Sequence, residues 1–268
     1  MMPNTTAKFK KNGVKFAHVI FFSYLCTQNC EHMENVNEQN IVVDESRQSV
    51  ARVLMRNVYL WMTGGLSVTA AMAWYVANTP ELFNLIYGKR WVYWSIIIAE
   101  IVFIVGLSGN IRKMHFMTAL LLYLAYCVVN GAFFSAIFVE FDLNLITQVF
   151  MVTAGSFVAL AVAGSFTKKD LTGMGTFLTM ALFGLIIATV IGLVMGNPRS
   201  IWISIIGVII FAGLTAYDAQ KIRQMMLEED TLTDGNMKLA LLGALTLYLD
   251  FINLFIQLLS LLGNKNND

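Results

Sequence analysis

Long apolar runs constrain this chain more than any other feature. A helix needs about 20 mostly apolar residues to cross the hydrocarbon core of a membrane. The composition agrees, since 57% of the residues are hydrophobic and only 13% are charged, which is far from the balance of a soluble domain. The sequence therefore predicts an all-α integral membrane protein. Six strong runs carry the prediction: residues 53–76, 94–108, 114–139, 145–166, 173–195 and 200–217, the second of them short unless it begins near Trp91.

A seventh run, residues 239–262, is long enough to span but carries Asp250 and Gln257. It is either a full span with a buried polar face or a re-entrant segment shielded by the other six. The connecting loops are short, which predicts one membrane domain over residues 49–263. An N-terminal extension, residues 1–48, precedes this domain, and a short tail, residues 264–268, follows it.

The distribution of lysine and arginine predicts the orientation of the spans. Ten basic residues near span ends fall on the side of the N-terminal segment, against four on the other side. We therefore expect a cytoplasmic N-terminus and the acidic "VEFDLN" loop outside. The C-terminus lies outside if all seven runs span, and inside if the seventh is re-entrant. The ten are Arg47, Arg52, Arg56, Arg112, Lys113, Lys168, Lys169, Lys221, Arg223 and Lys238, and the four are Lys89, Arg90, Arg199 and Lys265.

Two interpretations fit the first 32 residues. The stretch "KFKKNGVKFAHVIFFSYLC" has the basic flank and short apolar run of a signal peptide, but it lacks a clear small-residue cleavage site. Translation could instead begin at Met33, with "MENVNEQN" as the start of the working protein. We favour Met33, because a signal peptide would place Arg47, Arg52 and Arg56 on the wrong side of the membrane.

Three ionisable residues lie within the apolar runs or at their ends: Glu100, Asp218 and Asp250. Charged groups inside a membrane cost several kcal/mol and are therefore candidates for function. Each also has a structural interpretation. Asp218 could be an interfacial acid paired with a nearby base, and Glu100 could reach the interface or stay protonated. Asp250 is the strongest candidate, because it lies about 18 Å along the helix from Lys238, near the middle of the bilayer.

Asp250 belongs to a polar stripe on the seventh run. Thr246, Asp250, Asn253 and Gln257 follow one another at spacings of 4, 3 and 4 residues, which places them on one face of a helix. This face must meet protein or water. It could hold neighbouring helices by hydrogen bonds, or it could line a path for an ion or proton.

Small residues recur every four positions on two other runs, and we expect them to allow close helix packing. Gly155, Ala159 and Ala163 form one such stripe, and Gly131 and Ser135 form another.

The residues indicate neither an enzyme nor a nucleic-acid-binding protein. His18, His32 and His115 do not pair with a plausible nucleophile, and no glycine-rich phosphate loop is present. Basic residues are scattered and the formal net charge is +1, which argues against a nucleic-acid partner. We expect no enzymatic activity and no bound cofactor.

Two signatures near the C-terminus resemble those of a known family. The stretch "GLTAYDAQKIRQM", followed about thirty residues later by "LYLDFINLFIQLLSLLG", is similar to the C-terminal part of the Bax inhibitor-1 family, in its bacterial branch. Three further stretches agree in order: "LSGNIRKM", "VVNGAFFSAIF" and "TKKDLTGMGTFLTMALFGLIIA". The resemblance covers roughly residues 45–263.

The resemblance implies a fold and a function. The fold would have seven transmembrane helices, with the last one central and the other six wrapped around it in two groups of three. Bacterial members are described as pH-sensitive calcium leak proteins in which two aspartates share a proton, and these match Asp218 and Asp250. A basic latch at the end of the second helix matches Arg112, with Lys113 next in line.

The remaining expectations follow from that function. Calcium would be the transported ion, held transiently by Asp218 and Asp250, and Glu100, Asn253 and Gln257 would be secondary candidates for its path. The expected location is a bacterial inner membrane. Some bacterial relatives are instead described as modulators of a membrane-bound ATP-dependent protease and lack the paired aspartates, so the alternative is a regulatory protein with such a partner. A proton-coupled transporter finds no support in inverted repeats.

Overall fold

The computed structural model describes residues 45–111, 113–167, 169–194, 201–229 and 231–264. The chain divides into two units at the bond between Ser49 and Val50. Residues 45–49, the described part of the first unit, are helical. Most of the expected N-terminal extension, with the choice between a signal peptide and a start at Met33, lies outside the described residues. All contacts below belong to the second unit.

The described part of the second unit is almost entirely helical and has no strand. Its first helix runs through residues 50–77. Seven further helices follow: α2 (Pro80–Tyr87), α3 (Arg90–Asn110), α4 (Phe116–Glu140), α5 (Leu143–Phe166), α6 (Thr172–Val194), α7 (Ile201–Leu227) and α8 (Asp234–Asn264).

Five of these helices are long and apolar enough to cross a membrane by length and composition, namely α4 to α8. The prediction of an all-α membrane protein is therefore confirmed. In α3 the apolar part is shorter, Ile98–Leu107. The helix itself begins at Arg90, close to Trp91, where a full-length second run would have to begin. The short helix α2 was not predicted. It begins at Pro80, whose fixed φ and missing amide hydrogen suit the first position of a helix.

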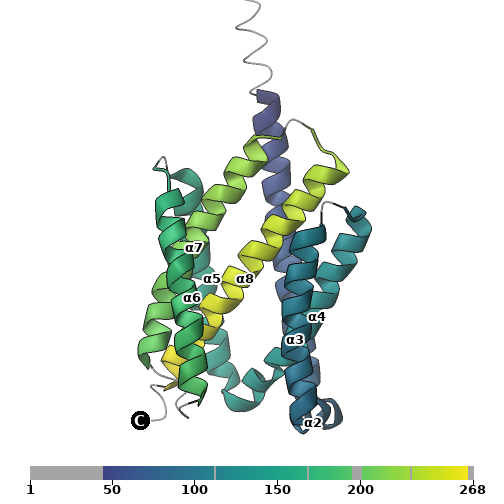
Figure 1. Cartoon of the computed structure of the whole chain (residues 1–268), viewed down its shortest axis with the longest axis vertical. Helices are drawn as coiled ribbons and strands as arrows, with labels where there is room; N and C mark the ends of the chain where they lie inside the picture. The colour runs from purple at the N-terminus through teal and green to yellow at the C-terminus, as the bar shows by residue number, and fades with distance from the viewer. Residues whose placement is uncertain (1–44, 112, 168, 195–200, 230, 265–268) are drawn as a thin grey trace, which may run out of the picture. The chain divides into compact units, whose positions relative to one another are not determined.

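Helix α8 packs against several of the other described helices. It packs most extensively against α7 and also contacts α5 and α4. Helices α5 and α6 pack on α7, whereas α3 packs on α4, so α8 passes between these two sets (Figure 1). In its apolar window 61% of the residues are buried, against 17–33% in the other four candidate spans. Thus α8 has the least surface left for lipid.

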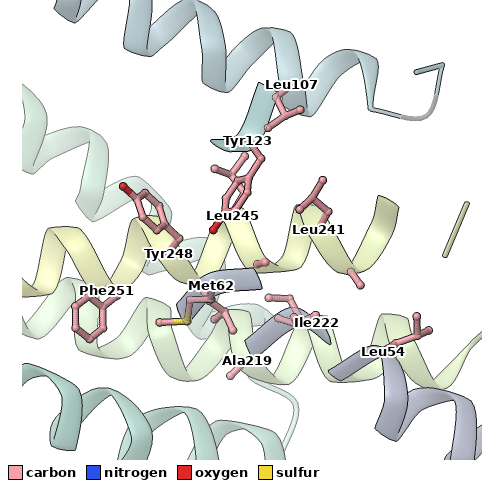
Figure 2. Close-up of a cluster of buried hydrophobic side chains, with 14 of the residues drawn as sticks. Leu54, Met62, Leu107, Tyr123, Ala219, Ile222, Leu241, Leu245, Tyr248 and Phe251 are labelled. Atoms are coloured by element: carbon pink, nitrogen blue, oxygen red, sulfur yellow. The ribbon is translucent and has the colours of Figure 1, made fainter. Parts of the chain in front are cut away.

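Figure 2 shows how both faces of α8 are covered. Tyr248 points to the side of α8 on which Tyr123 of α4 lies, and Ala219 and Ile222 of α7 lie on the other side. Tyr248, Tyr123 and Ala219 are completely buried. In water, burying apolar surface stabilises a protein by about 25 cal/mol per Å², so large buried side chains are the usual source of core stability. Within lipid the gain comes from close packing.

The prediction about small residues is confirmed on one helix and wrong on another. Gly131 and Ser135 of α4 are buried, and a Cβ at Gly131 would lie 2.5 Å from the carbonyl oxygen of Thr69. Gly155, Ala159 and Ala163 of α5 are all exposed. The packed face of α5 instead carries Thr153, Phe157, Ala161 and Gly164. A four-residue repeat of small side chains does not identify the packed face when larger side chains can fill the same contact.

Candidate membrane-embedded acid pair

Asp218 of α7 and Asp250 of α8 lie side by side within the second unit. Their carboxyl groups are close enough to form a hydrogen bond with each other. Asp250 is only 6% exposed, and its Oδ2 atom has no hydrogen-bond partner among the described residues. Two ionised carboxylates offer only acceptor atoms, so their contact becomes a hydrogen bond when one proton is present. A hydrogen bond between the two carboxyl groups therefore requires one proton on the pair.

The helix that carries Asp218 extends beyond the predicted apolar run. The apolar run ends at Tyr217, which suggested a residue at the end of a span, but α7 continues to Leu227. Asp218 therefore lies about 14 Å before the end of its helix, measured along the axis. Hydropathy falls after Tyr217 because polar residues follow it, but the backbone hydrogen bonds of the helix continue to Leu227.

Other polar side chains line the contact between α7 and α8. Gln257, two helical turns beyond Asp250 and so on the same face of α8, packs against α7 at Gly207, where a Cβ would lie 2.6 Å from its Cδ atom. Ser204 of α7 donates to Ser260 of α8 at 3.0 Å between the oxygens. We call Ser204, Asp218, Asp250, Gln257 and Ser260 the α7–α8 polar seam. It runs along much of the length that the two helices share.

The two remaining members of the predicted stripe bond to their own helix. Asn253 donates through Nδ2 to the carbonyl of Leu249 at 2.8 Å, and Thr246 donates to the carbonyl of Leu242 at 3.1 Å. Both side chains are half-buried. The stripe is thus present on α8, and its contacts with α7 are made by Asp250 and Gln257.

Lys221 is the described cation whose charge acts on Asp218. It lies one turn further along α7, and its Nζ atom is 5.7 Å from the centroid of the Tyr217 ring. This fits the interpretation of Asp218 as an acid with a nearby base, since a spacing of three residues in a helix brings two side chains together. The latch candidate Arg112 lies outside the described residues, and Lys113 is exposed. Near them, the Met114 carbonyl accepts a hydrogen bond from Lys238 at 2.9 Å.

Close to the acid pair, α7 also holds the connection between α5 and α6. Gln220, 6% exposed, accepts from the Leu171 amide at 3.0 Å and donates to the carbonyls of Thr167 and Lys169 at 3.3 and 2.8 Å. Arg223 donates to the carbonyl of Ser165, and its guanidinium lies 5.2 Å from the centroid of the Phe166 ring. Arg223 thus satisfies a carbonyl in the last turn of α5 that has no partner within the helix, and Gln220 binds backbone groups of the connection that follows.

Glu100, the third candidate acid, does not join the pair. It lies on α3, and its electrostatic interaction is with Tyr126 of α4. Its Oε1 atom is buried and has no hydrogen-bond partner among the described residues. The structure thus brings Asp218 and Asp250 together and places Gln257 two turns away in the same contact between α7 and α8. It places Glu100 elsewhere, with Tyr126 of α4.

The acid pair is not part of a larger set of metal-binding side chains. Within the described ranges, no group of three or more His, Cys, Asp or Glu residues could hold a metal ion. The pair itself offers four carboxyl oxygens, whereas Ca²⁺ takes about six to eight oxygen ligands. A calcium ion bound here would need ligands beyond the two carboxylates.

A helical chain with several apolar spans and carboxyl groups enclosed between them is a polytopic α-helical membrane protein. The model of the family described as "Inhibitor of apoptosis-promoting Bax1" matches residues 51–267. The chain belongs to the Bax inhibitor-1 family, as its C-terminal signatures indicated.

Bacterial proteins of similar length are similar to most of the chain. The inner membrane protein YbhL of Escherichia coli is 41% identical over 213 residues, covering 79% of this chain and 91% of the relative. An uncharacterized protein of Borreliella burgdorferi is 36% identical over 229 residues, covering 82% and 98%. An uncharacterized membrane protein of Streptococcus pyogenes is 32% identical over 203 residues, covering 75% and 87%.

Proposed function

We propose that this protein is a pH-sensitive calcium leak channel. The observation that carries the proposal is the contact between the carboxyl groups of Asp218 and Asp250 inside the helical core. A protein that needed only to join two helices there could use apolar side chains, which are often at least as stabilising as buried ionisable groups. A buried pair that gains and loses a proton, by contrast, alters the charge between α7 and α8 and thereby the packing of those helices.

The gate proposed here is a competition for Asp218. A shared proton holds Asp218 and Asp250 together, whereas a nearby cation stabilises the ionised carboxylate of Asp218. Lys221 supplies such a charge from the same helix. Arg112, which lies outside the described residues, is the second candidate for this role. The two protonation states of the pair therefore favour different contacts between α7 and α8.

The proposed path for calcium follows the α7–α8 polar seam. Calcium prefers oxygen ligands, and the seam supplies carboxylate, amide and hydroxyl oxygens from two adjacent helices. Asn253, about one turn after Asp250 on α8, adds a further amide group. Since the acid pair alone provides too few ligands for a resident ion, water and the amide oxygens would complete a transient coordination shell.

We propose seven membrane spans with α8 innermost, in a bacterial inner membrane and with the N-terminus in the cytoplasm. The first helix and α3 would be the two spans beyond the five that length and composition identify. Burial on both faces of α8 supports its inner position. The Escherichia coli relative is named an inner membrane protein, which supports the location, and the excess of basic residues on one side supports the orientation.

Calcium flux into proteoliposomes at several pH values tests the proposed function. Asp218→Asn and Asp250→Asn each remove one titrating group while keeping the side-chain volume, so we expect both to flatten the pH dependence of flux. Asp234→Asn is the matched control, because it makes the same change at an exposed residue at the start of α8. Its pH profile should match that of the native protein.

Two results would reject the proposal. One is an unchanged pH profile in both acid-pair variants, which would remove the role of the pair in gating. The other is a native protein without calcium flux that co-purifies with a membrane-bound ATP-dependent protease, which would favour the regulatory alternative. A comparison of Lys221→Gln with Arg112→Gln then decides which cation stabilises ionised Asp218, since the pH profile should shift only in the variant that lacks the true partner.

A further inference from the structure

A second polar cluster lies between α3 and α4, away from the acid pair. Tyr126 and Asn130 are one turn apart on α4 and share a face. Asn130 donates through Nδ2 to the Tyr126 hydroxyl at 2.7 Å. Glu100 of α3, which packs against α4, interacts electrostatically with Tyr126. We call Glu100, Tyr126 and Asn130 the Glu100 cluster.

This cluster contains two buried acceptor atoms without a hydrogen-bond partner among the described residues, Glu100 Oε1 and Asn130 Oδ1. Asn130 is only 3% exposed. Its Oδ1 atom belongs to the amide group that bonds to Tyr126, so it lies beside the same hydroxyl. Native proteins rarely leave such buried atoms unsatisfied. Two such atoms, one on α3 and one on the α4 face that it packs against, leave room for a further partner.

The chemistry of the cluster limits what this partner is. Both unsatisfied atoms are acceptors, so the partner donates a hydrogen bond or carries positive charge. The ligand atoms are all oxygens, which disfavours soft metal ions. Tyr126 accepts from Asn130 and keeps its own hydrogen for another acceptor. The cluster therefore requires a donor or a hard cation.

The charge of the cluster sets the charge of the partner. When ionised, Glu100 carries one negative charge, and no charged side chain among the described residues acts on it. The titratable groups around it are Tyr126 and Cys127 of α4 and, beyond them, Tyr248 of α8. Tyrosine and cysteine are ordinarily neutral at pH 7. One positive charge neutralises the cluster, whereas a divalent ion would leave an uncompensated charge within the helices.

We propose that the Glu100 cluster is a binding site for a single positive charge, either a proton on Glu100 or a monovalent cation such as sodium. Glu100 provides the charge, and Asn130 and Tyr126 provide the remaining oxygens. The site is separate from the acid pair and does not depend on the proposed calcium flux. Its occupancy stabilises the contact between α3 and α4.

Thermal unfolding of the purified full-length protein in lipid nanodiscs tests the site. The unfolding temperature is measured at several pH values, in sodium chloride and in choline chloride at equal ionic strength. A bound cation raises it with the logarithm of its concentration. Glu100→Gln keeps the shape but removes the charge, so its unfolding temperature should lose the response of the native protein. Glu81→Gln, the same change at an exposed residue of α2, should keep that response.

Two further measurements separate a proton from a metal ion. A sodium response that choline does not reproduce, and that Glu100→Gln abolishes, identifies a monovalent cation. A pH response without a sodium response, together with an infrared carbonyl band of a protonated carboxyl that disappears in Glu100→Gln, identifies a proton. Tyr126→Phe should weaken sodium binding by up to about tenfold, the factor that corresponds to 1.4 kcal/mol.

The proposal is overturned if Glu100→Gln responds to sodium and pH as the native protein does. It is also overturned if calcium alone stabilises the native protein and that effect disappears in Glu100→Gln, because the site would then take a divalent ion. Flux experiments on Asp218 and Asp250 do not bear on either result. The two proposals can therefore fail independently.

Discussion

At the scale of single residues, a buried hydrogen-bond chain joins three helices. Thr69 of the first helix donates to the carbonyl of Cys127 in α4 at 3.1 Å, and its hydroxyl lies 2.7 Å from that of Tyr248 in α8. Threonine has only one hydroxyl hydrogen. Since Thr69 uses it on Cys127, Tyr248 must donate to Thr69. The direction of each bond predicts which substitution is the more damaging.

Thr69→Val should destabilise the protein more than Tyr248→Phe. The valine leaves the Tyr248 hydroxyl buried without an acceptor, which costs about 1–3 kcal/mol, whereas phenylalanine removes the donor and leaves Thr69 bonded to Cys127. The double variant should be less destabilised than the sum of the two single variants. Equilibrium unfolding in mixed micelles measures all three, and strict additivity would contradict the proposed coupling.

Two glycines of α5 should respond differently to alanine. A Cβ at Gly164 would lie 2.0 Å from the carbonyl oxygen of Ala216 in α7, and backbone atoms cannot easily move aside. At Gly155 no atom lies within 4 Å. We expect Gly164→Ala to destabilise the protein by about 1–3 kcal/mol through overpacking. Gly155→Ala should be neutral or stabilising by up to about 1 kcal/mol, and a similar loss in both variants would contradict this contrast.

At the scale of helices and their connections, polar side chains fix where α5 ends and α6 begins. Asp170 accepts hydrogen bonds from the side chain and the backbone amide of Thr172, the first residue of α6. The distance from the amide nitrogen to the Asp170 oxygen is 2.9 Å. These bonds hold the pKa of Asp170 below its usual value. Gln220 binds the same connection from α7. The connection is therefore fastened from both its own sequence and a neighbouring helix.

The stabilisation by Asp170 should depend on pH. Because the pKa is lower in the folded state, the contribution is complete above the pKa of the unfolded chain and disappears as the pH falls through the folded pKa. The difference in unfolding temperature between the native protein and Asp170→Ala should thus be largest at neutral pH and vanish in acid. A difference that grows in acid would show that another group is responsible.

Gln220→Leu should loosen the connection between α5 and α6. The leucine leaves the Leu171 amide and two carbonyls without their partner, at a cost of about 1–3 kcal/mol for the buried groups. Limited proteolysis should then cut residues 167–171 faster than in the native protein. Gln224→Leu makes the same change one turn later on α7, where the side chain is exposed. Equal cleavage in both variants would argue against the role of Gln220.

At the scale of the whole molecule, the orientation of α8 follows from the number of spans. Its apolar stretch, Asp234–Gly263, is one unbroken helix of 30 residues, about 45 Å long and thus sufficient for a full crossing. With seven spans and a cytoplasmic N-terminus, the C-terminus lies outside.

Alkaline phosphatase fused after Asp268 should therefore be active, and green fluorescent protein at the same point should not fluoresce. Fusions after Leu232, before α8, should give the opposite pattern. A re-entrant α8 would make both positions cytoplasmic.

The sequence predicted the class of fold and the two members of the acid pair, because apolar runs and charged interruptions are local properties of the chain. It did not predict that α7 continues past Tyr217, since helix length depends on backbone bonds and tertiary support. The packed face of α5 was also predicted wrongly, because it depends on which side of the helix meets α7. Gln220 and the grouping of Glu100 with Asn130 depend on contacts between distant segments, for which one sequence provides no pattern.

The burial of α8 has a consequence for biogenesis. The ribosome releases α8 after α4, α5 and α7, the helices that pack against it. Until then, α4 and α7 have no partner for the surfaces that later cover Tyr248 and Asp250. These helices must therefore remain in the insertion machinery or in the bilayer without α8 until it is inserted. A nonsense mutation between Leu227 and Asp234 would leave the preceding helices inserted without α8, and such a chain should be a target for membrane quality control.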